Sequence, residues 1–215
     1  MEKEKKYPEI EEIRPADIEK RSFEIIDGIL KARGIILPEE EAPVTKRCIH
    51  TSADFDYADN LCYSEGVIKI LKDAIRSGAS IVTDTQMARS GINKKRLALC
   101  GGKVYCFMSD DDVAEEARKR GVTRAIVSME KAAALDERCI FAIGNAPTAL
   151  IELTKLIREG KIDPIAVIGV PVGFVNVTAS KEMIMECGVP YIIARGNKGG
   201  SNIAACICNA LLYNI

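Results

Sequence analysis

From about residue 64 to the C-terminus, short apolar segments alternate with longer segments of helical periodicity. Strands are expected at 79–83, 103–108, 139–143, 164–169 and 191–194. Helices are expected at 64–77, 85–90, 110–120 and 123–134, then after the loop 144–148 as far as Arg158, from about Ala179, and after the loop 195–201 as far as Leu212. This alternation is typical of parallel βαβ units, and right-handed crossovers place helices on both faces of the sheet. The sequence therefore predicts an α/β fold with a buried, mainly parallel sheet.

The N-terminal part follows a different pattern. Residues 1–14 are expected to be a loose, charged lead-in, and a helix is expected to begin near Pro15 and to end at Gly34. Residues 35–43 contain two prolines and several glutamates and are interpreted as a connector. A short strand or extended segment from Val44 to Thr51 would then deliver His50 to a loop. Because no clear linker or repeat is visible, one domain is expected over residues 1–215.

Composition narrows the classes of function. The chain has 215 residues and a net charge of −1, which argues against a general polyanion binder, because nucleic-acid-binding domains usually carry a basic excess. The charged start leads into no apolar segment, and no stretch approaches the length of a membrane span. We therefore expect a cytoplasmic protein that binds neither nucleic acid nor membrane.

Eight cysteines accompany a single histidine. No C-x-x-C pair occurs, and a chain of this size does not need disulfides to build a core. Most of the cysteines lie in apolar segments and are expected to be small buried hydrophobic residues. Neither a metal site nor a cofactor is expected.

In an open parallel sheet, ligands bind beyond the carboxyl ends of the strands. Five loops are expected there, at Asp84, Ser109, Gly144, Val170 and Arg195. The last three loops are rich in small and turn-forming residues, which let backbone N–H groups approach an anionic ligand. Tight turns alone would also explain any one of them. The loop 195–201 resembles a phosphate cradle but lacks the order of residues of a nucleotide P-loop.

His50 is the best single candidate for a catalytic group, because histidine titrates near neutral pH. A lone histidine is more often structural, but Arg47 can hold an anion three residues away and Asp54 offers a polar partner. A Ser-His-Asp hydrolase is conceivable, although no G-x-S-x-G elbow is present. A thiol nucleophile at Cys48 is also conceivable.

Several motifs together resemble the precorrin-8X (cobalt-precorrin-8) methylmutase family. They are Arg47-x-x-His50 with Asp54-Phe55, GNAPTAL at 144–150, G-x-PVGFV at 169–175 with SKE at 180–182, GNKGGS at 196–201, and NALL at 209–212. The resemblance runs from about Ile13 to Leu212. One departure is Ala88, where a valine is usual in the family, and this conservative change puts little in doubt.

The resemblance implies a flavodoxin-like three-layer fold, a homodimer, and an isomerase that moves a methyl group from C-11 to C-12 of the macrocycle, giving hydrogenobyrinate or cobyrinate in cobalamin synthesis. It places the catalytic histidine at His50 and substrate contacts at Ser22 and Arg47. The substrate is a tetrapyrrole-derived polycarboxylate, so further contacts are expected from basic side chains and N–H-rich loops. These are Thr85, Asn145, Lys181, Arg195, Lys198, Gly199, Gly200 and Ser201.

Methyl migration around a conjugated ring needs no cosubstrate, and one positioned acid can bias the ring. Two other classes of function stay open at this point. One is a corrinoid-binding or carrier protein without turnover, and the other is a phosphate-ligand enzyme that uses the loop 196–201. The sequence also leaves open whether the substrate contains cobalt and whether the product is handed over to other cobalamin-pathway enzymes.

Overall fold

The computed structural model describes residues 10–215, which form two compact units, one that ends at Ile36 and one that covers 37–215. In the first unit a short 3-10 helix (Pro15–Asp17) leads into α1 (Ile18–Ala32), and Gly34 follows with a positive φ of 70°. The predicted helix is thus confirmed. Residues 1–9 of the expected lead-in lie outside the described residues, and one domain over the whole chain stays a prediction.

The second unit is built on a six-stranded sheet with the order β1-β6-β5-β4-β2-β3. The strands are β1 (Leu61–Tyr63), β2 (Ser80–Thr83), β3 (Val104–Tyr105), β4 (Cys139–Ile143), β5 (Ala166–Gly169) and β6 (Tyr191–Ala194). Strands β2 to β6 are parallel, whereas β1 pairs antiparallel with β6 at one edge. The prediction of a mainly parallel sheet is therefore confirmed.

The order of the parallel strands is that of flavodoxin. Counted along the chain from β2, the five strands lie in the order second, first, third, fourth, fifth. The connections reverse direction between β2 and β4, which makes this pair the topological switch point where doubly wound folds commonly bind their ligand. The extra antiparallel strand β1 lies at the opposite edge from β3.

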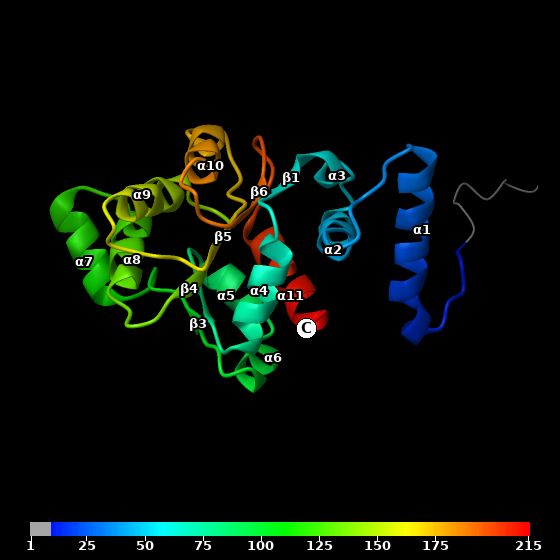
Figure 1. Cartoon of the computed structure of the whole chain (residues 1–215), viewed down its shortest axis with the longest axis horizontal. Coiled ribbons are helices and arrows are strands. Elements are labelled where there is room, and N and C mark those ends of the chain that lie inside the picture. Colours follow the sequence, from blue (N-terminus) through cyan, green and yellow to red (C-terminus); the bar gives the residue numbers. More distant parts are fainter. Residues whose placement is uncertain (1–9) are drawn as a thin grey trace, which may run out of the picture. The chain divides into compact units, whose positions relative to one another are not determined.

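Helices cover both faces of this sheet (Figure 1). On one face α11 packs against α2, α4 and α5, and on the other α9 packs between α8 and α10. The helices of the second unit are α2 (Ala42–Ser52), α3 (Tyr57–Asn60), α4 (Val67–Arg76), α5 (Gln86–Gly91), α6 (Lys94–Leu99), α7 (Asp111–Arg120), α8 (Arg124–Ala133), α9 (Pro147–Arg158), α10 (Val177–Met185) and α11 (Ser201–Tyr213).

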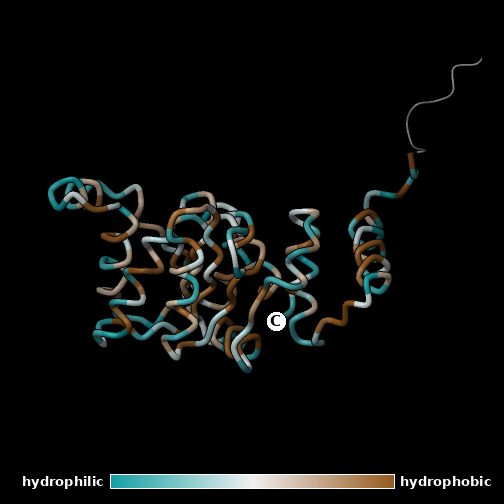
Figure 2. The backbone as a smooth tube through the Cα atoms, turned by 90° about the horizontal axis from the view of Figure 1, so that it is seen from above, coloured by the Kyte–Doolittle hydropathy of each residue, from teal (hydrophilic) through white to brown (hydrophobic). Residues whose placement is uncertain are grey.

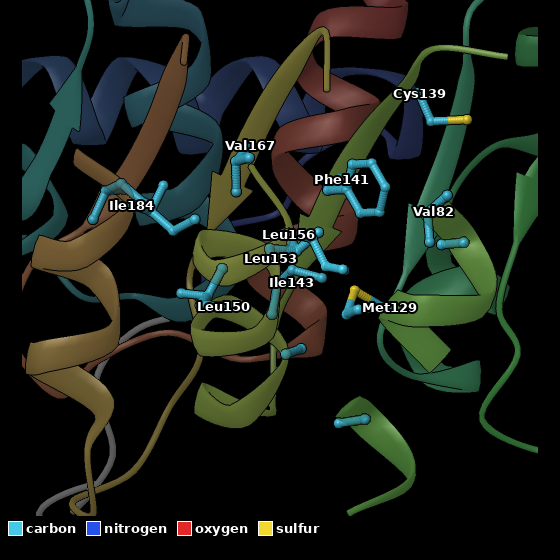
Figure 3. Close-up of a cluster of buried hydrophobic side chains, with 14 residues drawn as sticks. Val82, Met129, Cys139, Phe141, Ile143, Leu150, Leu153, Leu156, Val167 and Ile184 are labelled. Carbon is cyan, nitrogen blue, oxygen red and sulfur yellow. The ribbon is translucent and has the colours of Figure 1, made fainter. Parts of the chain in front are cut away.

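The core lies on the two sides of the central strands. On the α9 face, Phe141 of β4 is buried against Leu150 and Leu153 of α9 and Met129 of α8 (Figure 3). The strands β2, β4 and β5 are buried along their whole length, as expected for strands covered on both faces. Figure 2 shows hydrophobic and hydrophilic stretches alternating along the chain of this unit.

One local expectation was wrong, and some short elements were missed. Residues 44–51 form part of α2 and not a strand, because Val44, Thr45, Cys48 and Ile49 recur at helical spacing and form the buried side of that helix. The short strand β1 and the helix α6 were not expected from the sequence. Among the described residues, no helix combines the length and the apolar character that crossing a membrane requires.

Candidate functional site

The carboxyl edge of the sheet brings together the loops that follow β2, β4, β5 and β6. At the switch point, the carboxylate of Asp84 accepts hydrogen bonds from the backbone N–H groups of Gly144 (2.9 Å), Asn145 (2.8 Å) and Ala146 (2.7 Å). Burial raises the pKa of Asp84, and the three N–H bonds oppose that rise. The carboxylate of Asp84 thus binds backbone N–H groups that were expected to face a ligand.

The start of α11 closes the same crevice. The hydroxyl of Ser201 lies 2.8 Å from that of Thr85, which also caps α5 by accepting from the N–H of Ala88. Gly144 lies so close to this helix start that an added Cβ would come within 2.7 Å of the Ser201 Cα. The side chain of Asn145 is exposed and remains available to a ligand.

The loops after β5 and β6 are fitted together through glycines. Gly200 donates its N–H to the Val170 carbonyl at 2.9 Å, and an added Cβ at Gly199 would lie 2.0 Å from the same carbonyl oxygen. Gly199 and Gly200 have φ of 157° and 137°. Gly173 donates to the carbonyl of Asn197 at 3.1 Å, so backbone hydrogen bonds join the two loops at two points.

Lys181 holds the second of these loops from within. Its side chain is fully buried, and its Nζ donates to the carbonyls of Gly196 (2.7 Å) and Lys198 (2.9 Å). Burial lowers the pKa of Lys181 to about 8. The structure therefore places Lys181 beneath the loop, where it shapes the backbone that a substrate would meet.

His50 lies in the last turn of α2 and its side chain is exposed. The helix ends at Ser52 and is followed by Ala53, a non-glycine residue in the left-handed region with φ of 54°. Immediately beyond, Asp54 and Asp56 form ion pairs with Lys198 at 2.6 and 2.5 Å. These ion pairs join the C-terminal end of α2, which bears His50, to the loop after β6 at the carboxyl edge of the sheet.

The other predicted basic residues occupy different positions. Arg195 lies at the carboxyl end of β6 and pairs with Glu182 through two contacts of 3.1 and 3.2 Å. Arg47 is half-buried on α2, one turn before His50. Lys198 is engaged by the two aspartates, so a substrate carboxylate would compete with them for its ammonium group.

Ser22 belongs to the first unit. Its hydroxyl donates to the Ile18 carbonyl one turn earlier in α1, at 3.0 Å. Its assignment to the site of His50 stays a prediction.

Sequence reasoning missed two kinds of residue at this edge. Asp84 was noticed as the residue after β2, but its role in holding the loop 144–146 had no sequence signal. The loop after β5 also exposes Phe174 (89%) and Val175 (79%), which the turn-rich composition concealed. Exposed apolar side chains beside a polar cluster indicate a binding surface.

This arrangement combines one titratable imidazole, several cationic groups and an apolar loop. It suits a large ligand with an apolar body and acidic arms, on which one group acts as acid or base.

Comparison with known proteins is consistent with this description. The family model described as precorrin-8X methylmutase matches residues 17–214. The cobalt-precorrin-8 methylmutase of Leptospira interrogans is 45% identical, over 91% of this chain and 92% of that protein. The precorrin-8X methylmutase of Pseudomonas aeruginosa is 36% identical, over 90% and 93%. The crystal structure of precorrin-8X methylmutase from Thermus thermophilus superposes with a TM-score of 0.81 at 37% identity, over 92% of this chain and 96% of that one.

Proposed function

Because the chain belongs to the precorrin-8X methylmutase family, and is thus an isomerase of cobalamin biosynthesis, we propose that His50 is the proton donor for its reaction. The methyl group moves from C-11 to C-12 of the precorrin-8 ring, and the product is hydrogenobyrinate or cobyrinate. The reaction is intramolecular, so the protein has to bind and polarise one substrate only.

The observation that carries this proposal is the position of His50. Its helix α2 ends at the carboxyl edge of the sheet, and the ion pairs of Lys198 with Asp54 and Asp56 fasten that end to the loop after β6. An exposed imidazole on an anchored helix end can be held against a ring that rests on the loops. A proton placed on or near the conjugated ring biases its electronic structure toward migration.

The residues near His50 suit the two kinds of surface on the substrate, its acidic arms and its apolar ring. The acetate and propionate arms require cationic partners, which Arg47, Arg195 and Lys198 supply. The ring itself is largely apolar, and the exposed side chains of Phe174 and Val175 offer it a contact surface at the same edge of the sheet. Lys181, Gly199 and Gly200 support this surface from below, and Thr85, Asn145 and Ser201 border it.

The test is to replace His50 by Gln and to follow the absorption spectrum after substrate is added, because migration changes the ring conjugation. We expect turnover to fall by on the order of 10²–10⁴, the usual contribution of one general acid, or about 3–5 kcal/mol of barrier. Binding of the product to the variant should persist. Lys95→Gln, an exposed change on α6, is the matched control.

The outcomes separate the candidate functions. Unchanged turnover in His50→Gln would remove His50 from the mechanism. Binding without any change of ring isomer in the wild type would instead indicate a corrinoid carrier. Thermal stabilisation by nucleotides, without response to a corrinoid, would favour a phosphate-ligand enzyme.

We further propose that the natural substrate contains cobalt. The support is the higher identity to the Leptospira interrogans protein (45%) than to the Pseudomonas aeruginosa protein (36%), whose names differ in this respect. Parallel assays with the cobalt and the metal-free macrocycle decide the question, and faster turnover of the metal-free form would contradict it.

We also propose that the protein is a homodimer in the cytoplasm. Its product would pass to other enzymes of the pathway. The family supports the dimer, and eight free thiols are typical of a reducing compartment. Sedimentation should give twice the chain mass of 23.5 kDa. A particle of the single-chain mass at assay concentration would contradict the dimer.

A further inference from the structure

The turn after β4 is held by a carboxylate that comes from the neighbouring strand. Asp84 directly follows β2, which pairs in parallel with β4, and its side chain is 0% exposed. Its Oδ1 accepts the N–H of Gly144, and its Oδ2 accepts those of Asn145 and Ala146. Because both oxygens are occupied and the side chain is buried, Asp84 cannot itself touch a substrate.

The same turn is held from its other side by the start of α11. An added Cβ at Gly144 would lie 2.7 Å from the Cα of Ser201 and 2.8 Å from the carbonyl oxygen of Gly200. The hydroxyl of Ser201 lies 2.8 Å from that of Thr85, the residue that follows Asp84. The backbone of the turn is therefore fixed between the start of α11 and the end of β2.

The side chain of Asn145 stands in contrast to this fixed backbone. It is exposed, and within residues 10–215 no hydrogen bond joins its amide to another residue. An amide offers two N–H donors and one carbonyl acceptor. The switch point thus presents to solvent a neutral hydrogen-bonding group whose backbone is held in one place.

The three N–H groups of the turn have the arrangement of an anion site. They are successive, and they precede α9, whose first residue is Pro147. Successive N–H groups at the start of a helix commonly bind carboxylates and phosphates. Here the carboxylate of Asp84 fills the place, and a second anion beside it would be repelled by the like charge. An anionic arm of a ligand could reach these N–H groups only by expelling Asp84.

We propose that Asp84 is a positioning and specificity-determining residue of the switch point. It fills the anion site before α9, so that this site rejects free anions, and it holds the backbone that presents the Asn145 amide to an oxygen of one substrate arm. The filled anion site stands on the hydrogen bonds of Asp84. The role of Asn145 rests in addition on the proposed function.

Asp84→Ala tests the anion site without any substrate. The change removes the carboxylate and leaves the three N–H groups beside a space that a small carboxylate can enter. Thermal unfolding is measured in sodium formate and in sodium chloride at equal ionic strength. We expect formate to raise the Tm of the variant by about 2–4 °C more than chloride does, because it binds the folded state.

The wild type and Asp73→Ala are the controls for this measurement. Asp73 is an exposed aspartate of α4 that pairs with Lys69 and Arg76 and accepts no backbone N–H of the turn. Both controls should respond equally to formate and chloride. An equal response of Asp84→Ala to the two salts would overturn the anion site. If Asp84→Ala does not fold, Asp84→Ser, which also vacates most of the space, serves in its place.

A double-mutant cycle tests whether Asp84 acts through Asn145. Asp84→Asn keeps the shape of the side chain but turns an N–H donor toward the N–H groups of the turn. We expect KM to rise roughly threefold to tenfold in Asp84→Asn and in Asn145→Ala, the effect of one lost hydrogen bond, with a smaller change in kcat. The double variant should have a KM no higher than that of the more affected single variant.

The cycle distinguishes positioning from a merely structural role. Effects on KM that multiply in the double variant would show that Asp84 does not act through Asn145 and would overturn that part of the proposal. Formate should also lower the KM of Asp84→Ala toward that of the wild type, and a KM unaffected by formate would count equally against it. Absence of turnover in the wild type would instead refute the proposed function, and the formate shift in Tm would still decide the anion site.

Discussion

The turns at the two edges of the sheet use glycine in different ways. At the amino edge, the turns into β5 and β6 contain Gly160 and Gly188, whose φ values are 66° and 74°, and an added Cβ would meet nothing within 4 Å at either. At the carboxyl edge, an added Cβ at Gly144 or Gly199 would overlap backbone atoms of another loop. Gly160 and Gly188 provide conformation alone, whereas Gly144 and Gly199 also provide space for a neighbouring loop.

The charged residues also differ between the two edges of the sheet. Near the amino edge, Arg138 and Asp163 form an ion pair of two exposed side chains. At the carboxyl edge, Asp84 and Lys181 are buried and bond to backbone groups of neighbouring loops. The carboxyl edge is therefore built to hold one geometry, as a binding site for a large rigid ligand requires.

The largest effect is expected from Gly199→Ala at the carboxyl edge. The new Cβ would lie 2.0 Å from the Val170 carbonyl oxygen, and backbone cannot move aside cheaply. We expect a loss of about 3 kcal/mol in the free energy of unfolding, measured by urea denaturation, together with a loss of turnover. Gly188→Ala, which adds only the cost of a left-handed alanine of about 1 kcal/mol, is the control. Equal losses in the two variants would contradict the distinction between the edges.

Lys181→Met tests the buried charge. The change keeps the aliphatic stem but leaves the carbonyls of Gly196 and Lys198 without their donor. A loss of about 2 kcal/mol in unfolding free energy is expected, with a raised KM because the loop is no longer held. In the wild type, the lowered pKa of Lys181 means that the unfolded chain binds more protons between about pH 8 and the usual value of 10.5, so this group's contribution to stability rises with pH in that window. An unchanged KM in the variant would remove Lys181 from the support of the site.

Ala53→Gly is expected to stabilise the protein. Ala53 has a positive φ of 54° at the end of α2, where a non-glycine residue costs about 1–2 kcal/mol. The greater freedom of glycine in the unfolded chain offsets part of that gain. We expect a net stabilisation of about 0.5–1 kcal/mol and a rise of about 2 °C in Tm, recorded by calorimetry. Destabilisation would show that other contacts of the Ala53 methyl outweigh the strain.

The smallest effect is expected from acidification of the clamp formed by Lys198 with Asp54 and Asp56. The hydrogen bond from Lys198 lowers the pKa of Asp54 below its usual 3.8, so the contribution of Asp54 to stability is complete above that value and is lost as pH falls through the lowered pKa. Thermal unfolding of the wild type and of Asp54→Asn, compared between about pH 6 and pH 3, measures it. The two curves should converge toward the acid end, and parallel curves would contradict the assignment.

Much of the fold could be predicted from the sequence because the buried strands are short apolar runs flanked by turn residues. The helix α2 was missed because Val44, Thr45 and Ile49 are β-branched and favour a strand locally, although their spacing with Cys48 is helical. Tertiary packing on α11 decides the matter, and it is not visible in a local window.

The sequence motifs named candidate site residues but not the contacts between them. The residues His50, Lys198 and Ser201 were identified by their motifs, and the structure brings their elements to one edge of the sheet. That Lys181 lies under its loop, and that Asp84 fills the switch point, depends on contacts between segments about 15 to 60 residues apart. Such pairings need the three-dimensional arrangement of the strands.

The carboxylate of Asp84 has a consequence for the thermodynamics of binding. Because its three N–H partners belong to the chain itself, the turn 144–146 loses its conformational entropy when the protein folds, and not when a substrate arrives. Fewer backbone torsions of this turn therefore have to become fixed when a substrate binds. The affinity for a bulky macrocycle is correspondingly less opposed by entropy than it would be at a loop that became ordered only around its ligand.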